Sequence, residues 1–190
     1  MRFVIYLLMM IVVALGVGFG LSYYALTDGR LFGVAQVGPW TAWPDVGANA
    51  PNPYTRGHLA RMAAFELGQS EGLQFIATTD SDGQPLTRDC AYRIFGNTPL
   101  ATFWTLVAQD EAGINIAAPD VAPAMRSSAI ARADDGAIII NVGTHLLPFN
   151  WLELTGEGPF KLVLTLYDTA AFSGFSSDAS MPAIIRGACA

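Results

Sequence analysis

The N-terminal stretch from Phe3 to Leu26 constrains this chain more than any other part of its sequence. It contains no charged residue and no proline, and only Met1 and Arg2 precede it. A helix rises about 1.5 Å per residue, so a helix over this run is long enough to cross the roughly 30 Å hydrocarbon layer of a bilayer. The sequence therefore predicts a transmembrane anchor over residues 1–27.

The same stretch favours a retained signal-anchor over a cleaved secretory signal. Its apolar run is longer than that of a typical signal, and it ends at residues 22–26 without a clear A-x-A cleavage pattern. Tyr23 and Tyr24 fit the aromatic belt of a membrane interface. Arg2 favours a cytoplasmic N-terminus, although Arg30 on the other side partly offsets it. We expect a single-pass protein of the bacterial inner membrane, with its C-terminal domain in the periplasm.

Small residues on one side of the predicted anchor suggest a helix contact. Gly16 and Gly20 have the GxxxG spacing that lets a second helix approach closely. Glycine is also common in membrane helices, and this explains the spacing at least as well. If the spacing is functional, the contact is with another membrane or envelope protein or with a second copy of this chain.

The composition of the rest of the chain indicates one folded, acidic domain. The roughly 160 residues beyond the anchor are enough for a single core, and they are rich in Val, Ile, Leu and Phe. The chain has sixteen Asp and Glu against ten Lys and Arg, a formal charge of −6, and no basic cluster. Such a surface matches a phosphate backbone poorly, so we expect no nucleic-acid partner.

Residues 28–52 are rich in Gly, Pro and Ala and predict a juxtamembrane linker. Trp40 and Trp43 within it can lie at the bilayer interface or pack against the domain, and packing is the preferred interpretation because both lie well beyond the predicted membrane exit. Asn52 is a candidate N-cap before Pro53, and an apolar face at helical spacing comes after it. We therefore predict one short amphipathic helix over residues 53–67.

Strand patterns dominate the chain from residue 71 onward. Short runs of β-branched and aromatic residues alternate with Asp/Gly turns, which predicts an antiparallel sandwich or barrel over residues 53–190. The two runs on either side of Asp80–Gly83 predict a β-hairpin. A small, polar tail over residues 170–190 is expected to wrap the surface. The predicted strands are 73–79, 86–96, 101–109, 126–133, 137–143 and 160–168.

The only two cysteines are Cys90, in a predicted strand, and Cys189, near the C-terminus. In an oxidising compartment they can pair and tie the tail to the centre of the domain. Two unrelated buried thiols are the equally weighted alternative.

Catalytic and metal-binding motifs are missing from the sequence. His58 and His145 lie outside any HExxH, HxH or Cys/His pattern, and there is no G-x-S-x-G elbow. We predict no catalytic residue, no metal and no cofactor, and we lean towards a non-enzyme. Ser127 and Ser128 follow Arg126 in a corner that can bind a carboxylate or a sugar hydroxyl, although a turn in which Ser side chains bond the backbone is the favoured interpretation.

Aromatic, Arg and Asn side chains typical of sugar-binding clefts are spread along the domain. A structural role is the stronger alternative, with Trp104 and Trp151 in the core and Arg93 or Arg126 paired with internal carboxylates. The candidate ligand-binding residues are Tyr54, Arg56, Arg61, Tyr92, Arg93, Trp104, Arg126, Asn150 and Trp151.

The order of several motifs resembles the family catalogued as domain of unknown function 1214, in its short, membrane-anchored bacterial form. The motifs are PYTRGHLARMAAFELGQSEG, CAYRIFG, FWTLVAQDEAG, RSSAIARADDGAIIINV, NWLELTGEGPF and LVLTLYD. The resemblance implies a jelly-roll-like β-sandwich. It also implies a protein with domain of unknown function 1254 as a partner, because the two domains are often encoded or fused together.

These observations lead to two functional hypotheses. The first is a non-enzymatic, membrane-anchored envelope protein that serves as an accessory or assembly subunit through its helix and β-sandwich. The alternative is a jelly-roll domain that binds or hydrolyses envelope glycans or glycopeptides.

Overall fold

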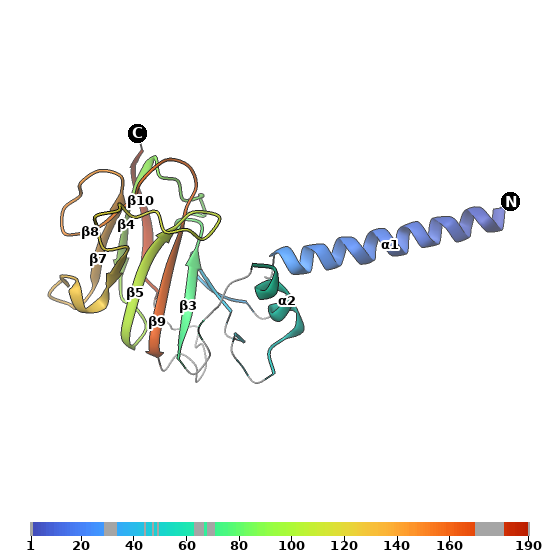
Figure 1. Cartoon of the computed structure of the whole chain (residues 1–190), viewed down its shortest axis with the longest axis horizontal. Helices are drawn as coiled ribbons and strands as arrows, with labels where there is room; N and C mark the ends of the chain where they lie inside the picture. The colour runs from blue at the N-terminus through green and yellow to red at the C-terminus, as the bar shows by residue number, and fades with distance from the viewer. Residues whose placement is uncertain are drawn as a thin grey trace.

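The computed structural model describes residues 2–28, 34–43, 45–46, 48, 50–62, 67, 71–169 and 181–189. It shows a two-sheet β-sandwich from which a long helix, α1 (Arg2–Asp28), projects. A short helix, α2 (Pro53–Met62), lies beside the end of α1 that is nearer the sandwich (Figure 1). The predicted mainly-β fold with one N-terminal apolar helix is confirmed.

One sheet has six strands and the other has four. In spatial order, the six-stranded sheet contains β1 (Ala35–Val37), β2 (Trp40–Ala42), β3 (Gly72–Ala77), β9 (Lys161–Thr169), β5 (Ala101–Gln109) and β6 (Ala124–Arg126). The four-stranded sheet contains β10 (Ala183–Cys189), β4 (Cys90–Gly96), β7 (Ile138–Gly143) and β8 (Asn150–Glu153). Paired strands are antiparallel except β7 and β8, which are parallel. The connectivity specific to a jelly roll stays a prediction.

The core lies between the sheets and is built from rows of cross-strand neighbours. Phe75, Leu164 and Leu106 form one such row across β3, β9 and β5. Ile94 and Ile140 face each other in the other sheet. All five are at most 1% exposed. Alternate residues of a strand point to the same face, so the period-two apolar pattern of these segments produces a continuous buried layer.

Helix α1 is apolar all round and touches little of the protein. The segment Arg2–Ala25 is long and apolar enough to span a membrane, and none of its most hydrophobic window is buried within the protein. A helix that is hydrophobic on every side needs an apolar environment, and here the sandwich does not supply it. Near the end of α1, the guanidinium of Arg61 in α2 lies 5.3 Å from the ring centroid of Tyr23.

The hairpin predicted around Asp80–Gly83 is wrong, because β3 and β4 belong to different sheets. Pairing across the turn consists of a bridge between Thr79 and Pro85, with backbone hydrogen bonds from Asp80 N to Gln84 O and from Leu86 N to Thr78 O. The next residues instead bond the segment that precedes β9, through Leu86 O with Phe160 N and Arg88 N with Gly158 O. The chain then crosses to the other sheet.

The predicted linker over residues 28–52 contributes two strands, β1 and β2, to the six-stranded sheet. Trp40 is fully buried, and its Nε1 donates a hydrogen bond to the carbonyl of Pro182 at 2.7 Å. The expectation that this tryptophan packs against the domain is therefore confirmed. The sandwich begins upstream of residue 53.

Four further segments differ from the sequence prediction. Residues 183–189 of the predicted surface tail form strand β10, while residues 170–180 lie outside the described part of the chain. Residues 127–129 of a predicted strand form a 3₁₀ turn, η1 (Ser127–Ala129), and β8 occupies a predicted loop. The short helix begins at Pro53 as expected, but its described part ends at Met62, and Leu67 is not helical.

Candidate functional site

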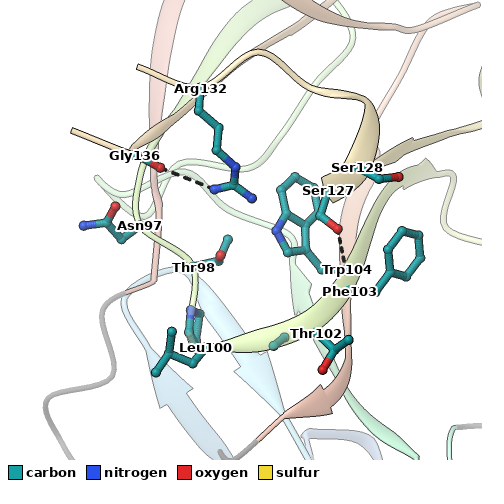
Figure 2. Close-up of a pocket in the computed structure, with 12 residues that line it drawn as sticks. Asn97, Thr98, Leu100, Thr102, Phe103, Trp104, Ser127, Ser128, Arg132 and Gly136 are labelled. Atoms are coloured by element: carbon teal, nitrogen blue, oxygen red, sulfur yellow. Dashed lines mark hydrogen bonds between the residues drawn. The ribbon is translucent and has the colours of Figure 1, made fainter. Parts of the chain in front are cut away.

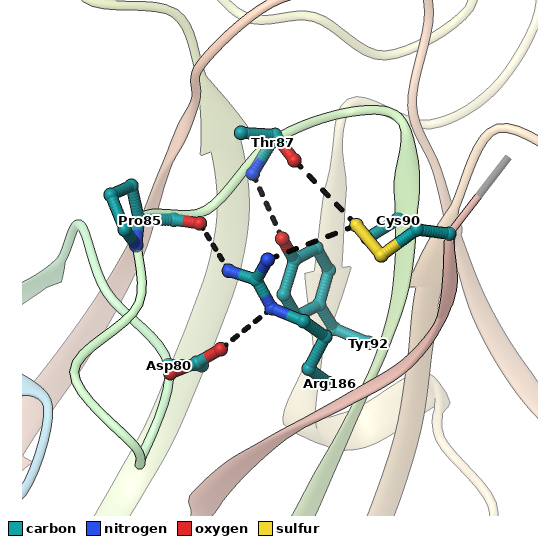
Figure 3. The surroundings of a disulfide bond; sticks show 7 residues. Asp80, Pro85, Thr87, Cys90, Tyr92 and Arg186 are labelled. Atoms are coloured by element: carbon teal, nitrogen blue, oxygen red, sulfur yellow. Dashed lines mark hydrogen bonds and ion pairs between the residues drawn. A yellow bond between two sulfur atoms is a disulfide. The ribbon is translucent and has the colours of Figure 1, made fainter.

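Cys90 and Cys189 form a disulfide bond (Figure 3). The two residues are cross-strand neighbours on β4 and β10, so the strand pairing itself brings the thiols together. The bond joins positions 99 residues apart in sequence. The predicted bridge from the C-terminal segment to the centre of the domain is confirmed.

An ion pair beside the disulfide fixes the same strand. Arg186 of β10 donates from Nε to Asp80 Oδ2 at 2.8 Å, and its Nη2 bonds the carbonyl of Pro85. Its guanidinium also lies 5.5 Å from the ring centroid of the buried Tyr92 (Figure 3). The site is structural, because it links the C-terminal strand to the turn that follows β3.

The pKa of Asp80 departs clearly from the ordinary value of an aspartate. Burial raises the pKa of this carboxyl, since the charged form loses hydration. Hydrogen bonds from the backbone N–H of Gln84, from Arg186 and from the N–H of Asp82, together with the positive charge of Arg186, outweigh burial. The net pKa of Asp80 lies below 3.8.

The structure does not bring the predicted ligand-binding residues into one cleft. Three of them, Tyr54, Arg56 and Arg61, are on α2 beside the anchor. Tyr92 is 1% exposed, and its hydroxyl accepts a hydrogen bond from the N–H of Thr87. Arg93 is exposed and lies 5.6 Å from the ring of Phe95 on its own strand.

Asn150 and Trp151, both on β8, use their side chains to hold backbone segments. The Asn150 amide donates to the carbonyls of Ala131 and Ile139 at 2.7 Å and accepts from Ala131 N at 2.8 Å. Trp151 Nε1 donates to the carbonyl of Gly143 at 3.1 Å. Both N–H groups of the Asn150 side-chain amide are therefore already used and cannot donate to a ligand.

Three hollows in the described part of the structure contain residues that the sequence singled out. The first, the Trp151 pocket, has a volume of about 300 Å³ and brings together the predicted residues Arg126 and Trp151 with Glu153. The second, the disulfide groove, has a volume of about 720 Å³ and is lined by Arg88, His145 and the two cysteines among others. Among the described residues, no group of three or more His, Cys, Asp or Glu is placed to hold a metal ion.

The third hollow, the Trp104 pocket, has a volume of about 520 Å³ (Figure 2). The sequence pointed to only some of the residues that line it. Its lining includes Trp104 and the Ser127–Ser128 corner, both of which the sequence singled out, and Arg132, which it did not. Arg126 of the predicted corner faces the Trp151 pocket instead. The Oγ of Ser127 accepts a hydrogen bond from Trp104 N at 3.2 Å, so it bonds a backbone N–H of the neighbouring strand β5.

The predicted contact face of α1 is open. A Cβ added at Gly16 or at Gly20 would meet no atom of the described residues within 4 Å, apart from the neighbouring backbone of α1 itself. Whether another helix packs there stays a prediction.

A helix long and apolar enough to span a membrane, followed by a disulfide-linked sandwich of two sheets, defines a β-sandwich protein with a candidate membrane anchor. The chain belongs to the family described as "Protein of unknown function (DUF1214)", whose model matches residues 71–171. This confirms the family resemblance seen in the sequence. A comparison with curated proteins finds no match.

Two solved structures are similar to this chain. The VPA0106 protein from Vibrio parahaemolyticus is 19% identical with a TM-score of 0.59, over 74% of this chain and 36% of that protein. A putative uncharacterized protein from Burkholderia cenocepacia is 14% identical with a TM-score of 0.43, over 87% of this chain and 38% of that protein. The first likeness shows a shared fold and nothing about activity. This chain spans little more than a third of either protein.

Proposed function

We propose that this protein is a non-enzymatic accessory subunit of the bacterial envelope, held in the inner membrane by α1 with its β-sandwich in the periplasm. Its partners in this role are other envelope proteins, of which a protein with domain of unknown function 1254 is one, or a second copy of the chain. The observation that carries the proposal is the Cys90–Cys189 disulfide.

A disulfide on the domain side of a membrane helix favours one orientation. Structural disulfides persist in oxidising compartments such as the periplasm and are rare in the cytosol, where thiols are kept reduced. Arg2 at the other end of α1 favours the cytoplasmic side by the positive-inside rule. The two arguments are independent and agree.

The open face of α1 supports the accessory role. Gly16 and Gly20 are four residues apart, so they lie about 40° from each other around the helix, and no other part of the described chain approaches them. Small residues on one face allow close packing of a second membrane helix.

The orientation can be tested with a thiol that the structure places in solvent. The Cys90→Ser variant leaves Cys189 unpaired, and the Cys189 side chain is exposed. A membrane-impermeant maleimide added to intact spheroplasts is expected to label this variant. A matched control carries Phe3→Cys in a chain with both native cysteines replaced, and it is expected to react only after lysis. Labelling of Cys189 only after lysis would reject the periplasmic assignment.

The predicted helix contact can be tested by replacing glycine with isoleucine on two different faces of α1. Gly16→Ile with Gly20→Ile is expected to reduce crosslinked complexes recovered in mild detergent, because the larger side chains hold a second helix away. Gly18→Ile is the matched control, since it lies about 200° from Gly16 around the same helix. Equal recovery from all these variants and the unmodified chain would eliminate the contact.

A further inference from the structure

The Trp104 pocket combines Trp104 and the Ser127–Ser128 corner, which the sequence singled out separately, with Arg132, and the family description assigns no site to it. It is formed by three separate segments: the connection from β4 into β5, the η1 turn, and the loop from Arg132 to Gly136. Its volume of about 520 Å³ is in the range of sites for small molecules.

Trp104 contributes a hydrogen-bond donor without an acceptor. Its side chain is 2% exposed, and its Nε1 is buried with no hydrogen-bond partner in the part of the chain that the structure describes. The other tryptophan indoles that pack in the sandwich, those of Trp40 and Trp151, both donate to backbone carbonyls. A buried N–H without a partner is unfavourable and therefore requires an explanation such as a bound ligand. Figure 2 shows the indole nitrogen on the side of the ring that faces Arg132 and Thr98.

Arg132 contributes a positive charge without a counter-charge. Its Nη1 donates to the carbonyl of Gly136 at 3.3 Å, which leaves most of its five N–H groups available. No ion pair joins it to a carboxylate in the described part of the chain, and none of the residues lining the pocket is acidic. Its guanidinium extends towards the indole of Trp104 (Figure 2).

These donors define the chemistry of the missing acceptor. A guanidinium and an indole N–H that face the same space complement an oxygen-rich group, and a guanidinium binds a carboxylate through two parallel hydrogen bonds. One positive charge balances one negative charge, so a monoanionic carboxylate fits better than a phosphate dianion. Asn97, Thr98 and Ser128, which carry polar side chains, line the same pocket.

We propose that the Trp104 pocket binds a small carboxylate-bearing molecule, with Arg132 and the Nε1–H of Trp104 donating to its oxygens. This goes beyond the proposed accessory function and does not depend on the orientation of the membrane helix. A sugar acid and the C-terminal carboxylate of a peptide are two sources of the same group.

The test uses the full chain in detergent micelles with ¹⁵N-labelled tryptophan, and follows the indole N–H signal that Trp104→Phe removes. Glucuronate represents sugar acids, with glucose as its neutral control. The peptide N-acetyl-Ala-Ala represents peptide termini, with its C-terminal amide as control. At least one of the two carboxylates is expected to shift the Trp104 signal at concentrations where its neutral control does not, and comparison of the two arms identifies the source.

Arg132→Gln is expected to weaken that binding by about tenfold or more, because a charged hydrogen bond is lost. Arg126→Gln is the matched control, since Arg126 lies close by in sequence but lines the Trp151 pocket, and it is expected to leave the affinity unchanged. Unchanged signals of the other indoles show that each variant is folded. The proposal is overturned if neither carboxylate shifts the Trp104 signal, if the neutral controls shift it equally, or if the two Arg variants bind alike.

Discussion

Removing the Cys90–Cys189 disulfide should cost this domain a large part of its stability. The bond closes a loop of 99 residues, and the chain-entropy relation for such a loop gives about 4.7 kcal/mol at 25 °C. Cys189 is exposed whereas Cys90 is 6% exposed, so Cys189→Ala breaks the bond with the smaller disturbance of the core. The substitution does not alter the residues of the Arg186–Asp80 ion pair or the other pairs between β10 and β4. It should therefore act mainly by increasing the conformational entropy of the unfolded chain.

The measurement is urea unfolding of the full chain in mild detergent, followed by tryptophan fluorescence. All four tryptophans lie outside α1, so the signal reports on the soluble part of the chain. We expect Cys189→Ala and the reduced unmodified chain to unfold at similar, lower urea concentrations, about 3–5 kcal/mol less stable than the oxidised chain. Reductant should not affect Cys189→Ala further, which makes this variant its own control. A loss of less than about 1 kcal/mol would refute the reasoning, because it would mean that only the end of β10 frays while the long loop contributes nothing.

Two further predictions concern polar contacts that hold the sandwich together. Asp80→Asn should cost about 2–3 kcal/mol near neutral pH, because a charged hydrogen bond to Arg186 is lost, whereas Asn at the exposed Asp82 should cost little. Because the pKa of Asp80 is depressed in the folded protein, its contribution to the free energy of unfolding is complete above pH 3.8 and is lost as the pH falls through the lower pKa of the folded state. The free energy of unfolding should therefore fall less steeply with acid in Asp80→Asn than in the unmodified chain, and identical pH profiles would contradict this. Asn150→Ala should cost about 2–3 kcal/mol in urea unfolding, because three hydrogen bonds to the backbone are lost, and Asn97→Ala, at an exposed position, is the control. Equal stability of the two Asn variants would show that the Asn150 contacts add nothing.

Strand positions could be predicted where local pattern and tertiary packing agree. Residues 101–109 form β5 as predicted, because alternate side chains such as Trp104 and Leu106 are buried against the core. Strand pairing could not be predicted with the same success. The Asp80–Gly83 turn has the residues of a hairpin turn, but β3 pairs with β2 and β9, both distant in sequence, and its Phe75 is buried beside Leu164 of β9.

The pockets were harder to predict than the strands, because residues distant in sequence form them. Trp104 was expected in the core, and it is there, but the missing partner of its Nε1 depends on what other segments place around it. Arg132 precedes the predicted turn at Asp134–Gly136 and has no sequence motif that distinguishes it from a surface arginine. Asn150 was predicted as a candidate ligand-binding residue, and only the hydrogen bonds of the structure show that its side-chain amide holds the backbone.

Strand β2, near the start of the sandwich, is connected to the segment that leads into its last strand, β10. Trp40 of β2 is fully buried in one sheet and bonds Pro182, which directly precedes β10 in the other. Strand β10 is in turn bonded covalently to β4 through Cys189. The segment that follows α1 therefore enters the core and contacts the strand that the disulfide fixes. These contacts join the described segment that contains β2 to both sheets.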